Sequence, residues 1–176
     1  MKARAQILVI AAILLSIGML ILAVAVDGGR LFLEQVRLDR AAQAAADAGI
    51  GIAAEQVVVL AAARQTEAAQ APACPACTPT PPPSPAEAWL ADSDREALTS
   101  SAMQVDVERE AMLYAERNGL AREATSVEYP FDYQPQDSAV RVRVETSRRV
   151  EILLAGLLNP DWAQLDAAAI SQIPQR

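Results

Sequence analysis

The fold of this chain is set by an uncharged apolar run, ILVIAAILLSIGMLILAVAV at residues 7–26, which passes directly into Asp27-Gly28-Gly29-Arg30. A helix rises about 1.5 Å per residue, so this run reaches about 30 Å, the thickness of the hydrocarbon core of a bilayer. Soluble cores rarely need a segment of this kind. We therefore expect residues 7–26 to form a transmembrane helix that anchors everything after it.

Positive charge before the run predicts its orientation. Lys2 and Arg4 precede it and no acidic residue accompanies them, which favours a cytoplasmic N-terminus. We expect a single-pass protein of the cell membrane, with residues 1–6 as a cytoplasmic tail and residues 27–176 outside the cytoplasm.

A cleaved signal peptide remains open as the alternative to a retained anchor. Residues 23–25 fit the small-x-small cleavage pattern, so cleavage would follow Ala25. The anchor is favoured because the helical pattern continues through this position without a turn signal. Gly28-Gly29 weakens that preference, since paired glycines could loosen the helix there.

Composition argues against several classes of function. The formal net charge is −7, which disfavours nucleic acid and anionic lipid as partners. The chain has no histidine and so lacks the commonest general base and the commonest metal ligand. We therefore expect no enzyme, no cofactor, no metal site and no small-molecule substrate.

Residues 27–70 continue the apolar run as an extended amphipathic helix. Mostly apolar or small residues recur there in alternating steps of four and three, the spacing of a helix–helix seam. The seam comprises Leu31, Gln35, Leu38, Ala42, Ala45, Gly49, Ile52 and Gln56. Arg30, Glu34 and Arg37 lie on the opposite side at spacings that suit ion pairs. Two interpretations stay open: the seam packs on the chain's own domain, or it packs on another chain.

The remaining sequence predicts a loop and an α+β head. Residues 71–86 are dense in proline and hold both cysteines, which excludes a helix or a central strand. The head comprises residues 87–176. Its patterns predict a helix over 87–119, with an N-terminal cap at Asp92 or Ser93 and a stop at Asn118-Gly119. They then predict strands over 125–129 and 140–146, an apolar helix over 150–158 and a last strand over 162–170. The fold class is then α+β, a long N-terminal helix followed by a small three-stranded antiparallel sheet.

Three phrases follow one another along the chain. The apolar run ends in VDGGRL at residues 26–31, LDRAAQAAADAG follows at 38–49, and YAERNG at 114–119 precedes the alternating valines of 140–144. This ordered set resembles the TadE/TadG-like pseudopilins of the tight-adherence (Tad/Flp) pilus assembly system, over residues 4–60 and 106–172. Gln43 and Ala5 depart from the pattern, because the family usually has an aspartate and a glycine there.

The resemblance implies a pilin-like head on a minor, membrane-embedded component of a Tad pilus, which assembles helix to helix and catalyses no reaction. Its partners would be other pilins or pseudopilins, a pilus-assembly platform and membrane lipid. The runner-up function is an accessory single-span subunit of an unrelated membrane complex.

The expected interface combines the junction after the span with the seam. It comprises Asp27, Gly29, Arg30, Leu31, Leu38, Ala42, Ala45, Gly49 and Ile52. For Asp27 and Arg30 a plainer interpretation stays open, an interfacial pair that only marks where the span ends, because unpaired charges at that depth are costly.

Both cysteines lie in Cys74-Pro75-Ala76-Cys77, which has the spacing of a redox motif. We favour a disulfide that closes a surface loop in an oxidising compartment, with unpaired thiols as the next interpretation. A secreted thiol–disulfide enzyme is a third function hypothesis, disfavoured by the surrounding prolines. Zinc would need two further ligands, and no other cysteine or histidine remains.

Overall fold

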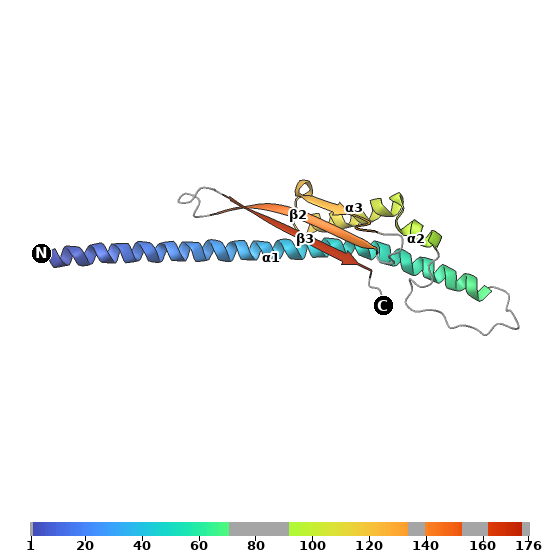
Figure 1. Cartoon of the computed structure of the whole chain (residues 1–176), viewed down its shortest axis with the longest axis horizontal. Coiled ribbons are helices and arrows are strands. Elements are labelled where there is room, and N and C mark those ends of the chain that lie inside the picture. Colours follow the sequence, from blue (N-terminus) through green and yellow to red (C-terminus); the bar gives the residue numbers. More distant parts are fainter. Residues whose placement is uncertain (1, 71–91, 134–139, 153–161, 174–176) are drawn as a thin grey trace. The chain divides into compact units, whose positions relative to one another are not determined.

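The computed structural model describes residues 2–70, 92–133, 140–152 and 162–173. Its elements, in chain order, are α1 (Lys2–Gln70), α2 (Asp92–Leu98), α3 (Ser101–Arg117), the 3-10 turn η2 (Arg122–Ala124), β1 (Thr125–Glu128), β2 (Arg141–Glu151) and β3 (Trp162–Gln172) (Figure 1). The α+β fold class predicted from the sequence is confirmed. The proline-rich loop expected at residues 71–86 lies outside the described residues.

Two compact units make up the chain. The N-terminal unit comprises Met1–Leu38 and Ser147–Asp166, and the core unit comprises Asp39–Thr146 and Ala167–Arg176. Parts of α1, β2 and β3 belong to each of them.

α1 is one uninterrupted helix of 69 residues, coloured from blue to green in Figure 1. Its sequence is rich in alanine and leucine, which are the best helix formers, and the first proline of the chain is Pro72. Nothing therefore breaks the helix between the apolar run and the alanine-rich part. The continuous helix predicted over residues 7–70 is confirmed, and it begins five residues earlier, at Lys2.

Small side chains bring α1 and α3 close together in the core unit. Ala42, Ala45 and Ala53 of α1 and Ala111 of α3 have no exposed surface. A Cβ atom added to Gly49 would lie 3.0 Å from the Cβ of Ala111, so the two helices approach more closely there than larger residues would allow. Figure 1 shows α3 running beside this part of α1.

The three strands form one antiparallel sheet in the order β1-β2-β3. Thr125 of β1 pairs with Thr146 of β2, and Val127 pairs with Val144. The side chains on β2 alternate, because Val142, Val144 and Thr146 are buried while the residues between them are half-buried or exposed. This is the period of two that the sequence predicts for a half-buried strand.

The helical stretch predicted over residues 87–119 is divided in the described part. α2 ends at Leu98, and α3 starts anew after Ser100, whose Oγ accepts a hydrogen bond from the backbone N–H of Met103 at 3.4 Å. The predicted N-terminal cap at Asp92 or Ser93 is wrong, because both residues lie within the short helix α2. The cap of the longer helix α3 is Ser100. The predicted stop is confirmed: α3 ends at Arg117, Asn118 is its cap, and Gly119 has a φ of +80°.

The helix predicted over residues 150–158 is wrong at its start. β2 continues through Val150 to Glu151, and Val150 is buried in phase with Val142 and Val144. Because the alternation of the strand extends further than the segment 140–146, the apolar residue at 150 belongs to the sheet pattern. Residues 153–158 of the expected helix lie outside the described residues. The third strand is confirmed and runs two residues beyond the predicted end at 170.

Candidate functional site: the apolar helix and its junction

The first part of α1 exposes its apolar side chains almost completely. The large hydrophobic residues from Ile7 to Val26 are 49–71% exposed. The most apolar window of 18 residues has a mean hydropathy of 3.1, and none of it is buried inside the protein. Apolar surface of this extent is far larger than the patches that soluble monomers expose. This helix is long and apolar enough to cross a membrane, and it lies near the N-terminus.

The apolar run contains a single polar side chain. Ser16 donates a hydrogen bond from its hydroxyl group to the carbonyl oxygen of Ala12, one turn earlier, at 2.9 Å. A hydroxyl group in hydrocarbon has no water to bond, so this bond within the helix removes the cost of burying it in lipid. The run is therefore compatible with lipid at every described position.

The junction after the run places its two charged residues in different surroundings. Asp27 is only 6% exposed and has an interaction partner, whereas Arg30 is exposed. Added Cβ atoms at Gly28 and Gly29 would meet nothing within 4 Å, so the glycines are not required by close packing within the chain. Leu31 is half-buried.

Polar contacts join α1 to the two strands within the N-terminal unit. Glu34 accepts hydrogen bonds from Arg37 at 2.9 Å and from Arg148 of β2 at 3.2 Å. Gln35 donates from Nε2 to the carbonyl oxygen of Asp166 on β3 at 3.0 Å. The predicted pairing of Glu34 with Arg37 is confirmed. The contacts to β2 and β3 were missed, because residues more than a hundred positions apart leave no local signal.

A depression of about 360 Å³ lies beside Glu34 in the same unit. It is lined by Arg30, Glu34, Arg148, Arg149, Val150 and Glu151. The guanidinium group of Arg149 lies 4.7 Å from the ring centre of Trp162, which is 42% exposed. Three of the residues that line the depression are arginines, and one of them, Arg149, stacks its guanidinium group on the indole ring of Trp162.

The predicted seam is largely buried within the chain. Leu38, Ala42 and Ala45 are at most 2% exposed, Gly49 is buried against α3, and Ile52 is half-buried. Of the two open interpretations, packing on the chain's own domain is therefore observed for Gly49. Beyond Gly49 the buried positions of α1 are Ile50, Ala53, Val57 and Ala61, whereas Ile52 and Gln56 of the seam are half-buried. A straight helix of 3.6 residues per turn drifts away from a strict repeat of 3.5, which explains the shift.

A salt bridge joins the end of α1 to α2 in the core unit. Arg64 bonds both carboxylate oxygens of Asp94, from Nε at 2.8 Å and from Nη2 at 2.9 Å, and it also bonds Glu67 at 3.0 Å. Hydrogen bonding to Asp94 and its negative charge raise the pKa of the Arg64 guanidinium above its ordinary value. Asp94 is 7% exposed, so this contact holds a nearly buried carboxylate. The pair leaves no local signal in the sequence, because its members lie 30 residues apart. Cys74 and Cys77, which lie between them in sequence, fall outside the described residues.

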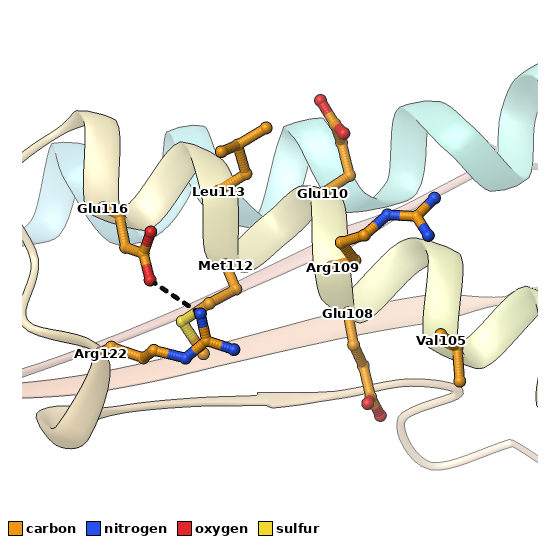
Figure 2. Close-up of a pocket in the computed structure, with 8 residues that line it drawn as sticks. All are labelled: Val105, Glu108, Arg109, Glu110, Met112, Leu113, Glu116 and Arg122. Atoms are coloured by element: carbon orange, nitrogen blue, oxygen red, sulfur yellow. Dashed lines mark hydrogen bonds and ion pairs between the residues drawn. The ribbon is translucent and has the colours of Figure 1, made fainter.

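The outer face of α3 carries a second depression, of about 470 Å³ (Figure 2). Val105, Met112 and Leu113 line it together with charged residues, among which Glu116 and Arg122 form an ion pair at 3.2 Å. Glu108 and Glu110 point in different directions in Figure 2, so they form no acid–base pair. Among the described residues, no group of histidine, cysteine, aspartate or glutamate could hold a metal ion.

No family model, no curated protein and no solved structure matches the chain.

Proposed function

We propose that this chain is a minor, pseudopilin-like component of a Tad-type pilus assembly system, anchored by residues 7–26 with its N-terminus in the cytoplasm. It acts by helix–helix assembly in and outside the membrane and catalyses no reaction. The proposal is carried by the change in surroundings along the single helix α1. Its apolar side chains over residues 7–26 are exposed, whereas further along the helix packs against α3 at Gly49.

The bare part of α1 offers a surface for sister helices. In lipid, helices associate through close van der Waals packing, which small residues permit. Ala11, Ala12 and Gly18 interrupt the larger side chains, and an added Cβ at Gly18 would meet nothing within 4 Å. Neighbouring subunits are therefore the partners that could cover this helix along with lipid.

Exposed apolar residues continue beyond the junction. Phe32 is 67% exposed and Leu33 is 57% exposed, although both follow the charged residues Asp27 and Arg30. Outside the lipid such side chains gain about 1.5–3 kcal/mol each when a partner buries them fully. A helix bundle that extends past the membrane surface would supply that burial, which favours assembly over a solitary anchor.

Because much of the seam of α1 is buried within the chain, that part of the helix surface is not available to other subunits. Of the predicted interface, Leu38, Ala42, Ala45 and Gly49 lie in the interior, whereas Arg30 is exposed. We propose that assembly contacts use the exposed side of α1 and not the seam. The redox state of Cys74 and Cys77 remains a separate prediction, a disulfide in an oxidising compartment.

Deletion of the gene, followed by counting of surface pili, tests the proposal directly. We expect piliation and adherence to be lost and to return with the full chain. A version that starts at Val26 behind an unrelated cleavable signal should not restore them, because it lacks the anchor. Unchanged piliation after deletion would remove this function.

Photocrosslinking distinguishes pilins from other partners. A benzoylphenylalanine at Phe32 or Leu33 should form adducts with pilins, whereas one at Val105 on α3 is a control of similar exposure, 59%, on a different element. Adducts only with subunits of another membrane complex would favour the accessory single-span subunit instead.

A further inference from the structure

One stretch of α1 in the core unit is apolar on both of its sides. Residues 48–63 read AGIGIAAEQVVVLAAA, in which Glu55 and Gln56 are the only polar residues. The inner side packs within the chain, where Ala53, Val57 and Ala61 are at most 3% exposed. A helix that is apolar all round is normally covered all round, because a solvated side carries charged and polar residues. The outer side of this stretch lacks those residues.

Two valines show how open the outer side is. Val58 is 62% exposed and Val59 is 60% exposed. A Cβ atom added to Gly51, two turns before Val58, would meet nothing within 4 Å. Contiguous exposed apolar surface is a mark of protein–protein contact sites. We call this surface the outer face of α1, and it comprises Gly51, Ile52, Glu55, Val58, Val59 and Ala62.

Glu55 lies at the centre of the outer face and has no counter-charge within the chain. None of the residues three or four positions from it is basic: they are Gly51, Ile52, Val58 and Val59. Among the described residues, none forms an ion pair or a hydrogen bond with its carboxylate. Water solvates this exposed charge while the face is open. A partner that covers the face must supply a cation, because a buried charge without one is costly.

This charge decides between the possible occupants of the outer face. Lipid chains would surround the Glu55 carboxylate with hydrocarbon and leave it uncompensated. A second copy that is anchored in the same membrane would pack its α1 in parallel and bring its own Glu55 opposite the first, where like charges repel. A helix with an arginine or lysine at that position satisfies both the apolar side chains and the carboxylate.

We propose that the outer face of α1 binds an apolar helix of a different membrane-anchored subunit, which runs parallel to α1 and places an arginine or lysine opposite Glu55. Glu55 then selects the partner, since helices without a cation there leave its charge unpaired. This inference deepens the proposed function, because it rests on the assembly of α1 with other helices, but it does not depend on a pilus.

Site-specific photocrosslinking in native membranes measures this contact. Benzoylphenylalanine replaces Val58 in the full chain, and Val105 on α3, which is 59% exposed, is the control position. We expect Val58 to form an adduct with one single-span protein that Val105 does not capture. Sequencing of the cross-linked peptide by mass spectrometry should place it in an apolar helix with an arginine or lysine within one turn.

Charge reversal tests the role of Glu55. Glu55→Lys should lower the yield of the Val58 adduct by more than about tenfold, because two cations then face each other. The matched control, Glu96→Lys on α2, makes the same change at an exposed glutamate away from the outer face and should leave the yield unchanged. Replacing the partner's basic residue by glutamate should restore the yield in the Glu55→Lys chain. An abundant bystander would show no such restoration.

The remaining outcomes each overturn a definite part of the proposal. An adduct of the chain with itself assigns the outer face to a second copy, and an adduct with lipid assigns it to the membrane. A yield that Glu55→Lys leaves unchanged overturns the selection by charge. Adducts from Phe32 with none from Val58 overturn this surface and leave the proposed function standing. Restored adducts from Val58 in cells whose piliation survives deletion of the gene remove the pilus and leave this contact standing.

Discussion

Gly49 is the residue at which the contact between α1 and α3 is tightest. An added Cβ would lie 3.0 Å from Ala111 Cβ and 3.4 Å from Val107, and the Cβ of Ala111 cannot move without its helix. We expect Gly49→Leu to lower the free energy of unfolding by about 1–3 kcal/mol, despite the better helix propensity of leucine. Thermal melting of the detergent-solubilised chain, followed by circular dichroism, measures this change.

The control for that prediction is two residues away on the same helix. An added Cβ at Gly51 meets nothing within 4 Å, so Gly51→Leu should leave the stability unchanged or raise it by up to about 1 kcal/mol. Equal losses at both positions would show that glycine is needed for backbone flexibility instead of for close packing.

Tyr129 makes the stability of the core unit depend on alkaline pH. Its hydroxyl group donates to the carbonyl oxygen of Leu98 at 2.6 Å, and the side chain is 2% exposed. Burial, and to a lesser extent Tyr133, raise the pKa of Tyr129 above its ordinary value of 10.0. The folded state therefore favours the neutral phenol group. The contribution of this group to the free energy of unfolding is complete below pH 10 and is lost as the pH rises towards the folded-state pKa.

Tyr129→Phe tests both parts of that statement. It should cost about 1–2 kcal/mol near neutral pH, because the carbonyl group of Leu98 loses its buried partner. It should also flatten the decline in melting temperature above pH 10. Tyr114→Phe, at a position that is 38% exposed, should leave the decline in place. An unchanged alkaline profile in Tyr129→Phe would contradict the assignment.

At the scale of elements, α2 depends on the salt bridge between Arg64 and Asp94. Substituting Arg64 by glutamine removes the charged, two-bond contact with the nearly buried carboxylate of Asp94. We expect amide hydrogen exchange in Asp92–Leu98 to become several-fold faster, as α2 separates more often from α1. The charge-swapped double variant, Arg64→Asp with Asp94→Arg, should recover much of the protection of α2 against hydrogen exchange.

The control for this pair is an exposed salt bridge elsewhere. Arg122→Gln removes the ion pair with Glu116. The side chains of Arg122 and Glu116 are 71% and 40% exposed, so the loss of this pair should not change hydrogen exchange in α2. If exchange in α2 is equally fast in both variants, the bridge between Arg64 and Asp94 is not what holds α2.

Elements with a strong local period could be predicted from the sequence, whereas contacts between distant elements could not. The apolar run, the proline-free helix up to Gln70, the alternating valines of β2 and the stop at Asn118-Gly119 each follow from residues close in sequence. The division at Ser100 was missed because helix formers continue on both sides of it. The bonds from Glu34 to Arg148 and from Arg64 to Asp94 depend on the folded arrangement alone.

The same reasoning explains which site residues could be identified. The span and its junction have a local signature, which is why Arg30 was singled out as an interface residue; the structure shows that it is exposed. Gly49 was chosen for its spacing, but spacing cannot say whether the covering helix belongs to the same chain. Arg149 and Trp162 were not linked in advance, because only the antiparallel pairing of β2 with β3 brings them together.

At the scale of the whole molecule, the central prediction is that residues 1–26 remain attached and fix the orientation of everything else. Alkaline phosphatase fused after Arg176 should be active, because the enzyme folds only outside the cytoplasm, and green fluorescent protein at the same position should be dark. The chain should stay in membranes after carbonate extraction, with its sequence from Met1 to Ala25 detectable by mass spectrometry.

Charge reversal before the span gives the matched test of orientation. Lys2→Glu with Arg4→Glu removes the positive flank, so phosphatase activity should fall while the chain stays in the membrane. Leu14→Arg leaves the flank intact but costs about 2.5–3.5 kcal/mol on insertion, and it should release chains from the membrane. These two failures differ, because the first changes the side on which the C-terminus lies and the second changes attachment. A soluble chain that begins at Val26, unaffected by either substitution, would mean that the apolar run is a cleaved signal and that no anchored assembly exists.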